Sequence, residues 1–258
     1  MALEGQFLQN VVVLRHGDRI DHADPSWTSS AARPWDPYLT EGGKMRAFST
    51  GRKLRANLDF PIHRVFTSPF TRCIETTNEV VAALCAINDD GSQVTGDNLE
   101  IDPSKLKVSI EYGLCEFLST EAIKTELLPK DGKFVYEMSK LEEMLPAGTV
   151  DSSVEHVYQG MPKWGESKTD VRDRYQGIIK ALAEKYPHEN LLLVTHAEAL
   201  VVAISALLEN VAVSGVEYCA YLHSRRLSST SESQPVLNPK EFELCGDSGM
   251  HYSPVDTS

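Results

Sequence analysis

The chain has 258 residues, with 25 Lys and Arg against 37 Asp and Glu, so its formal net charge is −12. This acidic balance argues against a protein that binds nucleic acid or a membrane surface, because such proteins usually present basic patches. Hydrophobic residues make up 41% of the chain, enough for a substantial globular core. We therefore expect neither nucleic acid nor a membrane as a partner, and an anionic ligand needs a local basic pocket.

The five cysteines are scattered, odd in number and without a Cys-x-x-Cys pair. This pattern indicates reduced thiols in a cytosolic or nuclear compartment, and it offers no zinc site. Residues 1–10 do not resemble a signal peptide, and the longest apolar run, 199–208, is too short to span a bilayer. We expect a cytoplasmic protein that needs no metal and no cofactor.

The first half of the chain predicts strands that alternate with helices. Residues 11–14 are a β-branched apolar run typical of a buried strand, and residues 40–60 have the spacing of an amphipathic helix. A second strand is predicted over 64–67, followed by Ser68 as the N-cap and Pro69 as the first residue of a helix. Residues 107–111 predict a third strand.

The second half begins with a less regular segment, residues 118–165, which is rich in Gly and Pro and which we interpret as an excursion over the active site. Ser167-x-x-Asp170 then predicts the start of a helix. Residues 191–195 are the clearest strand of the chain, and a helix is predicted to follow from about 198 to 208.

A last strand is predicted over 218–222, and residues 223–258, rich in Ser and Pro, predict a flexible tail. The alternation of strands and helices predicts an α/β fold in one domain over residues 1–222. The expected architecture is a three-layer sandwich, in which helices cover both faces of a mostly parallel central sheet.

Basic side chains follow three of the predicted strands. Arg15, His16 and Arg19 follow the first strand, Arg72 lies in the helical turn after the second, and His196 ends the strand 191–195. Ligands of open α/β sheets bind at the carboxyl ends of the strands, where helix N-termini also attract phosphate. Three arginines and two histidines at this edge predict a site for a phosphate dianion.

A phosphate site becomes an enzyme if it holds a nucleophile and an acid. A neutral imidazole such as that of His16 can attack phosphorus near pH 7 without a metal. Expulsion of an alkoxide leaving group also requires a proton, and Glu116, just beyond the third strand, is the candidate acid.

Five ordered blocks of the chain resemble the histidine phosphatase superfamily, which has the phosphoglycerate mutase-like fold. Within branch 1 of that superfamily, the blocks are most similar to Sts-type phosphatase domains and to related plant proteins of the phosphoglycerate mutase family. The blocks, which extend over roughly residues 8–222, are Arg15-His16-Gly17-x-Arg19, Pro34-Trp35-Asp36-Pro37 with Leu39-Thr40-x-x-Gly43, Thr67-Ser68-Pro69-x-x-Arg72-Cys73-x-x-Thr76, Gly113-Leu114-x-Glu116-Phe117 and Val194-x-His196-Ala197.

The resemblance implies a metal-independent phosphomonoesterase that forms a covalent phosphohistidine at His16. It implies Glu116 as general acid and then general base, and His196 as a further catalytic residue. The phosphate ligands that it implies are Arg15, Arg19, Arg72 and His196.

Three alternatives remain open. Glu198, in the run His196-Ala197-Glu198, resembles the proton donor of phytase-like members of the other branch and is an alternative acid or a substrate contact. A mutase is the second alternative, although Ile20-Asp21-His22 lacks the Asn-rich segment that mutases share. A weakly active phosphate-binding or scaffold domain is the third. The sequence does not decide between a phosphorylated small molecule and a phosphopeptide as substrate, or indicate the oligomeric state.

Overall fold

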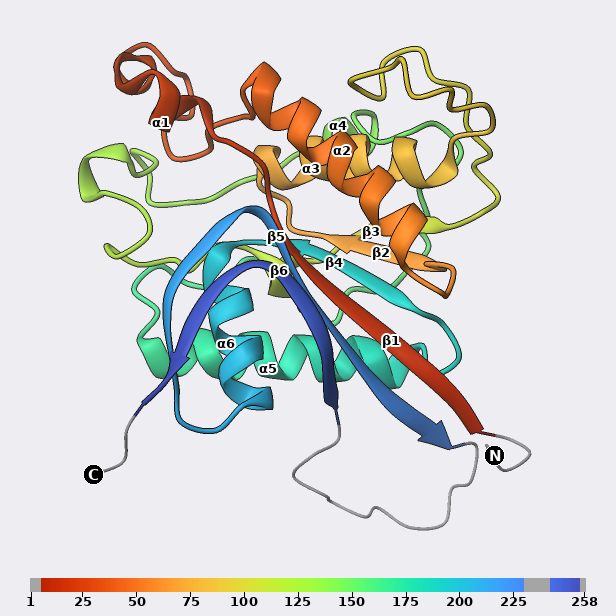
Figure 1. Ribbon diagram of the computed structural model, residues 1–258. Coiled ribbons are helices and arrows are strands. Elements are labelled where there is room, and N and C mark those ends of the chain that lie inside the picture. Colours follow the sequence, from red (N-terminus) through yellow and green to blue (C-terminus); the bar gives the residue numbers. More distant parts are fainter. Residues whose placement is uncertain (1–5, 230–241, 256–258) are drawn as a thin grey trace.

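Figure 1 shows the computed structural model, which describes residues 6–229 and 242–255. Six strands form one mixed sheet in the order β3-β2-β4-β1-β5-β6. Parallel pairing joins four of them, namely β1 (Gln6–Arg15), β2 (Arg64–Thr67), β3 (Lys107–Ile110) and β4 (Leu191–Thr195). The strand β5 (Val211–Ser229) runs antiparallel to β1, and β6 (Glu243–Pro254) pairs antiparallel with β5.

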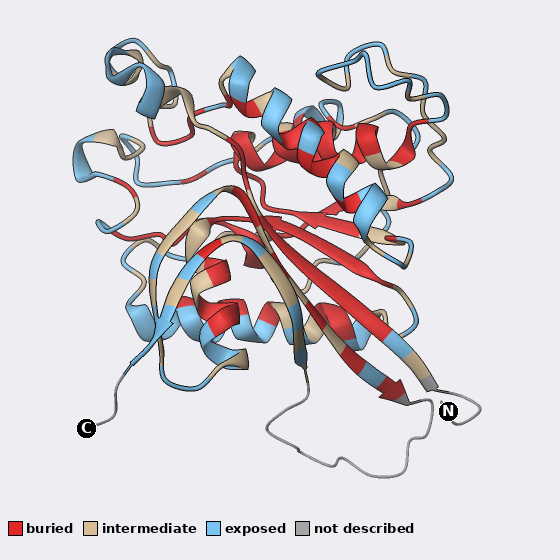
Figure 2. Ribbon diagram, in the orientation of Figure 1, coloured by how far each residue is buried: buried red, intermediate tan, exposed pale blue. Residues whose placement is uncertain are grey.

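Helices cover both faces of this sheet, which confirms the predicted three-layer α/β fold. The helices α2 (Glu41–Asn57) and α3 (Thr71–Cys85) lie on one face, and α5 (Lys168–Lys185) and α6 (Ala197–Leu207) lie on the other (Figure 1). Figure 2 shows that buried residues concentrate along the parallel strands and the helix sides that face them. In the part of the chain that the structure describes, no helix is long and apolar enough to cross a membrane.

The local signals for strands and helices are confirmed where a buried element begins or ends. All five residues of β4 are buried, so this strand is a continuous apolar run without alternation. The Thr40 hydroxyl accepts a hydrogen bond from the Gly43 amide and caps α2. Ser167 and Asp170 form a capping box at the start of α5, as their spacing predicts.

Short helices lie in the connections. They are α1 (Ile20–Ala23), η1 (Pro25–Ser29), η2 (Tyr112–Leu114), η3 (Thr125–Leu127) and α4 (Met138–Glu142). Residues 118–165 contain only η3 and α4 as helices, and an apolar cluster of their own fixes them to the body of the protein. In that cluster Ile123 and Phe134 pack with Trp35 and Phe70.

The predicted flexible tail over 223–258 is wrong for residues 223–229 and 242–255, while residues 230–241 and 256–258 lie outside the described part. The strand predicted over 218–222 is only the middle of β5, which pairs with β1 from Tyr221 to Ser229. Residues of β6 pair along the outer side of β5. An antiparallel strand with one solvated face needs no apolar run, so the Ser-rich and Arg-rich sequence here conceals two strands.

Candidate active site

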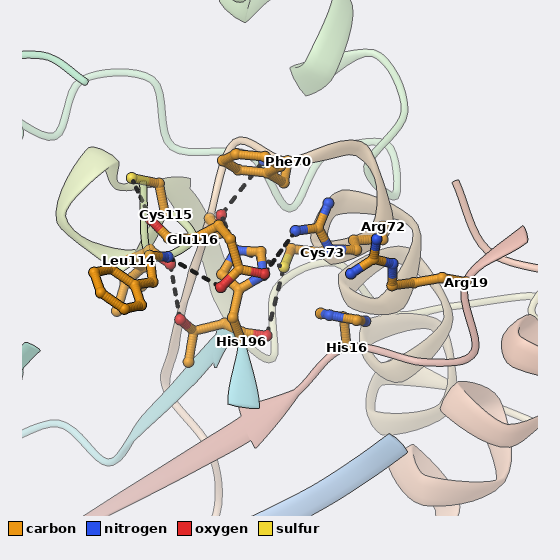
Figure 3. A network of polar contacts seen from close by, with 12 residues as sticks. His16, Arg19, Phe70, Arg72, Cys73, Leu114, Cys115, Glu116 and His196 are labelled. Atoms are coloured by element: carbon orange, nitrogen blue, oxygen red, sulfur yellow. Dashed lines mark hydrogen bonds and ion pairs between the residues drawn. The ribbon is translucent and has the colours of Figure 1, made fainter. Parts of the chain in front are cut away.

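Four loops after the parallel strands meet at one edge of the sheet. His16 follows β1, Arg72 lies in the first turn of α3, Glu116 follows η2, and His196 follows β4. Figure 3 shows the side chains of Arg72, Glu116 and His196 pointing toward one another, with His16 close by. The ring centroids of His16 and His196 are 5.4 Å apart. The parallel order of the strands thus brings together residues that are up to 180 positions apart in sequence.

His16 has the protonation pattern of a nucleophile. Its Nδ1 lies 2.8 Å from the Gly17 carbonyl oxygen, which can only accept a hydrogen bond. Nδ1 therefore carries the proton, and Nε2 keeps a free lone pair. Burial, together with the positive charge of Arg72, lowers the pKa of His16 well below 6.5. The imidazole is consequently neutral at neutral pH.

Two arginines beside His16, the buried Arg72 and the half-buried Arg15, keep unused hydrogen-bond donors. The Nε and Nη1 atoms of Arg72 and the Nε atom of Arg15 have no hydrogen-bond partner among the described residues. The Arg15 guanidinium stacks on Tyr218, with its central carbon 4.2 Å from the ring centroid. Unpartnered buried donors are costly unless a ligand supplies acceptors, so this arrangement favours an anion.

Arg19, the third predicted arginine, is held differently. Its guanidinium pairs with Asp21, with Nη2 2.6 Å from the carboxylate oxygen Oδ2. It nevertheless lines the same cavity as Arg15 and His16.

Glu116 is a buried carboxylate with two distinct oxygens. Oε2 lies 2.9 Å from Nη2 of Arg72 and 3.1 Å from Nδ1 of His196, and Oε1 accepts a hydrogen bond from the Phe117 amide at 3.0 Å. Burial alone would raise the pKa of Glu116, but His196 and Arg72 outweigh it and hold the pKa well below 4.5. Without a ligand, Glu116 is therefore ionised.

His196 is buried and neutral, because burial lowers its pKa to about 4. Its Nδ1–H donates to Glu116, and its Nε2 accepts from the Ser68 hydroxyl at 2.9 Å. The 3.2 Å contact between Nδ1 and Nη2 of Arg72 then joins two donors and is not a hydrogen bond. Ser68 fixes the ring, a role that the sequence analysis missed.

Ser68 is not the helix cap that its sequence position predicts. The helix α3 begins at Thr71, and its N-cap residue Phe70 makes no side-chain cap. Instead the buried carboxylate of Asp36 accepts from the Thr71 amide at 2.8 Å and from the Thr71 hydroxyl at 2.7 Å. A carboxylate that is distant in sequence thus replaces the local cap and leaves Ser68 free to bind His196.

A cavity of about 340 Å³ opens over His16, Arg15 and Glu116. Its lining residues are Arg15, His16, Arg19, His22, Glu116, Phe117, Glu121, Ala122, Ala197 and Glu198. A second cavity of about 390 Å³ shares Arg19, His22, Glu121 and Ala122 with it. This second cavity is also lined by Arg72, by Trp35 and by side chains of the segment from Thr120 to Leu127.

Of three further side chains around the first cavity, the sequence predicted one and missed two. Glu198, predicted as an alternative acid, lines the cavity, and burial, with Glu116 and Glu121 nearby, raises its pKa. His22, which also lines the cavity, and Tyr218, whose hydroxyl lies 2.6 Å from Nδ1 of His22, were missed. No local motif marks either residue, because α1 and β5 meet only in the folded chain.

One nitrogen or oxygen atom from each of His16, Glu116 and His196 lies within 4.8 Å of the others, a spacing that three metal ligands could have. The Arg72 guanidinium, however, lies 2.9 Å from Glu116 and already supplies the positive charge here. A divalent cation would be repelled by Arg72 and Arg15, whereas a phosphate would be attracted. The charges therefore fit an anion better than a metal.

Residues 136–229 match the family model of the histidine phosphatase superfamily (branch 1). No curated protein matches the chain in sequence. The fold is similar to that of ecdysone phosphate phosphatase from Bombix mori in complex with tungstate, with a TM-score of 0.59 and 23% identity over 89% of this chain and 95% of that chain. It is also similar to phosphoglycerate mutase from Bacillus anthracis, with a TM-score of 0.54 and 18% identity over 88% of this chain and 93% of that chain. The narrower resemblance to Sts-type domains stays a prediction. The comparisons show that residues 136–229 match the histidine phosphatase superfamily (branch 1) and that the chain shares the fold of these two structures.

Proposed function

We propose that the protein hydrolyses phosphate monoesters through a covalent phosphohistidine at His16. The observation that supports this most directly is the free Nε2 lone pair of a buried, neutral imidazole. It lies beside buried guanidinium nitrogens of Arg72 and Arg15 that lack partners. A nucleophile beside a dianion site is the minimum that phosphoryl transfer requires.

In the first step, Nε2 of His16 attacks phosphorus and the bond from phosphorus to the ester oxygen breaks. Arg15, Arg19, Arg72 and the Nδ1–H of His196 bind the phosphoryl oxygens and offset their charge. Glu116 gives its proton to the departing oxygen, so the product leaves as an alcohol or a phenol.

In the second step, water attacks the phosphorus of phospho-His16 and the P–N bond breaks. The Glu116 carboxylate takes a proton from that water, and inorganic phosphate leaves as the imidazole is restored. Glu116 thus acts first as an acid and then as a base, and ends the cycle with the proton that the next turnover needs.

The low pKa of Glu116 in the free protein fits this cycle if the substrate itself raises it. A bound phosphate draws Arg72 and the Nδ1–H of His196 toward its own oxygens and places negative charge beside the carboxylate. Both effects favour the protonated form of Glu116. Glu198 is the alternative acid, because burial already raises its pKa. Mutation of Glu198 is needed to test that role.

The substrate class is a phosphorylated small molecule or a phosphopeptide. The names of the two similar structures, ecdysone phosphate phosphatase and phosphoglycerate mutase, both refer to phosphate esters. Two cavities that share a wall offer room for the group that carries the phosphate. A mutase and a weakly active phosphate-binding domain are the competing functions.

The test compares wild type with His16→Ala on p-nitrophenyl phosphate and on 3-phosphoglycerate with a bisphosphate primer. We expect wild type to release phosphate and His16→Ala to be slower by more than about 10³-fold, as expected when a nucleophile is lost. An acid-labile, covalently bound phosphoryl group should be trapped on wild type and not on His16→Ala. Equal release by both proteins would refute the hydrolase, primed isomerisation without net release would indicate a mutase, and phosphate binding without turnover would indicate a binding domain.

A further inference from the structure

Glu116 lies in a segment whose backbone has no strand ladder to hold it. Residues 113–116 follow β3 and leave η2 for a loop. Four consecutive carbonyl oxygens, from Gly113 to Glu116, accept hydrogen bonds from side chains instead. The donors are Arg174 for residues 113, 115 and 116, the Thr195 hydroxyl for residue 114 and the Tyr175 hydroxyl for residue 115. The segment therefore takes its shape from α5 and from the end of β4.

Arg174 supplies most of these contacts, and all five of its N–H groups are used. Nη1 donates to the carbonyls of Gly113 and Cys115, both at 2.9 Å, and Nη2 donates to the Glu116 carbonyl at 3.1 Å. Nε and Nη2 donate to the Glu166 carboxylate at 2.6 and 2.7 Å. Lysine has three donors on a single point and cannot reproduce this planar fork.

The contact with the Glu116 carbonyl reaches the carboxylate through one rigid group. The Glu116 C=O and the Phe117 N–H belong to the same planar peptide unit. Its oxygen accepts from Arg174 at 3.1 Å, and its N–H donates to Oε1 of Glu116 at 3.0 Å. Rotation of this peptide would break both bonds. The orientation of the Glu116 carboxylate is thereby tied to Arg174, although Arg174 touches neither oxygen of it.

We propose that Arg174 is a positioning residue that sets the proton-transfer geometry of Glu116, an inference that rests on the proposed function. Glu166 completes the arrangement, because its Oε2 also accepts from the Leu118 amide at 3.0 Å and so fixes the far end of the segment. The substrate meets Glu116 from the side of Arg72, and Arg174 holds Glu116 from behind.

The experiment measures kcat/KM of Arg174→Lys on an aryl phosphate, p-nitrophenyl phosphate, and on an alkyl phosphate, glycerol phosphate. A nitrophenolate can leave without being protonated, whereas an alkoxide needs a proton from the general acid. Misplacement of that acid should therefore slow the alkyl ester more than the aryl ester. We expect the alkyl value to fall about 10- to 100-fold and the aryl value by less than about threefold. In a Glu116→Gln background, Arg174→Lys should leave the alkyl-to-aryl ratio unchanged.

Arg64→Lys is the matched control, since Arg64 pairs with Glu189 at 2.9 Å and Asp151 at 3.1 Å at the opposite end of β2. Its alkyl-to-aryl ratio should equal that of wild type. Equal loss on both esters in Arg174→Lys, the same ratio change in Arg64→Lys, or a further ratio change on top of Glu116→Gln would overturn the inference.

A milder variant covers the case in which Arg174→Lys does not fold. Tyr175→Phe removes one bond to the same segment, the 2.7 Å contact with the Cys115 carbonyl, and should lower the alkyl-to-aryl ratio less, in the same direction. An unchanged ratio would count against the inference. The proposed function is judged separately, because it depends on His16→Ala and not on this ratio.

Discussion

Two buried arginines reach Glu116 from opposite faces of the sheet, and they do so in opposite ways. Arg72 comes from α3 and contacts the carboxylate, while its Nε and Nη1 atoms have no hydrogen-bond partner among the described residues. Arg174 comes from α5, contacts the backbone behind the carboxylate and uses every donor that it has. Both side chains are almost wholly buried, with 1% and 4% exposed.

The difference shows that the hydrogen-bond partners of a buried arginine indicate whether it binds a ligand or supports the fold. Folding rarely leaves buried donors unsatisfied, because each costs roughly 1–3 kcal/mol. A side chain that keeps such donors next to a cavity is suited to a ligand that supplies the acceptors. A side chain whose donors all bind backbone and carboxylate is part of the support. On this reasoning Arg72 should control affinity, and Arg174 should control stability and geometry.

The first and largest expected effect separates these two roles. Arg174→Gln should lower the free energy of unfolding by about 3–5 kcal/mol, because it leaves Glu166 buried without its partner. Arg72→Gln should destabilise less, since Glu116 keeps its contacts with His196 and Phe117. Arg72→Gln should instead weaken phosphate binding about 10- to 100-fold through the loss of charge-assisted hydrogen bonds.

Urea unfolding and phosphate titration calorimetry on both variants provide the measurement. Folded Arg174→Gln should bind phosphate within about threefold of wild type, because Arg174 does not line the cavity and bonds only to backbone carbonyls and to Glu166. If both variants lost affinity and stability in the same proportion, the distinction between the two arginines would be unfounded.

The two halves of the sheet differ in how far the sequence could predict them. The parallel strands are buried on both faces, so runs such as residues 191–195 stand out without any knowledge of their partners. The strands β5 and β6 bury only part of their surface and depend on pairing with β1 and with each other. That information is not local, and for this reason a Ser-rich segment was interpreted as a tail.

The site shows the same division between local and distant information. Residues at strand ends, such as His16 and His196, could be predicted because a strand followed by a basic turn is a local pattern. Arg174 could not be, because in sequence it is one arginine on an amphipathic helix. The predicted cap role of Ser68 is wrong, since the carboxylate that caps this helix belongs to Asp36, 35 residues before Thr71 along the chain.

The next prediction concerns the loop from His16 to Arg19, which lies on the side of Arg72. Close backbone contacts with α2 hold this loop in place. A Cβ atom added to Gly43 would lie 2.6 Å from the Asp18 carbonyl oxygen and 2.8 Å from the Asp18 nitrogen, in the loop between His16 and Arg19. Neither atom can rotate away, so Gly43→Ala should cost about 1–3 kcal/mol of stability. By displacing Arg19, it should also weaken phosphate binding.

Gly42→Ala is the control for that substitution, because it lies in the same helical turn and its Cβ would meet only the Thr40 hydroxyl, at 3.7 Å. Alanine is favoured over glycine in a helix by roughly 1 kcal/mol, so this variant should be neutral or slightly more stable. Thermal unfolding of the two variants with and without phosphate checks both statements. A Gly43→Ala protein as stable as Gly42→Ala would mean that the loop does not depend on this close approach.

The smallest expected effect is the pH dependence that His196 contributes. Burial lowers its pKa to about 4, against 6.5 in an unfolded chain. Between those values the unfolded chain binds a proton that the folded chain does not, so stability falls as pH falls. From pH 7.5 to 5.5 this contribution is about 1 kcal/mol.

Glu75 acts in the opposite direction, because burial raises its pKa to about 6 and its protonation favours the folded chain as pH falls. The quantity to measure is therefore the difference between wild type and His196→Gln in urea unfolding at the two pH values, in which Glu75 and His16 cancel. Wild type should lose about 1 kcal/mol more than the variant over this range. An equal loss in both would show that His196 is not held neutral, and that the Glu116 carboxylate stabilises its protonated form despite the opposing charge of Arg72. A charged His196 would bring a further cation to the phosphate, and the Arg72 side of the site would then bind anions more tightly as pH falls.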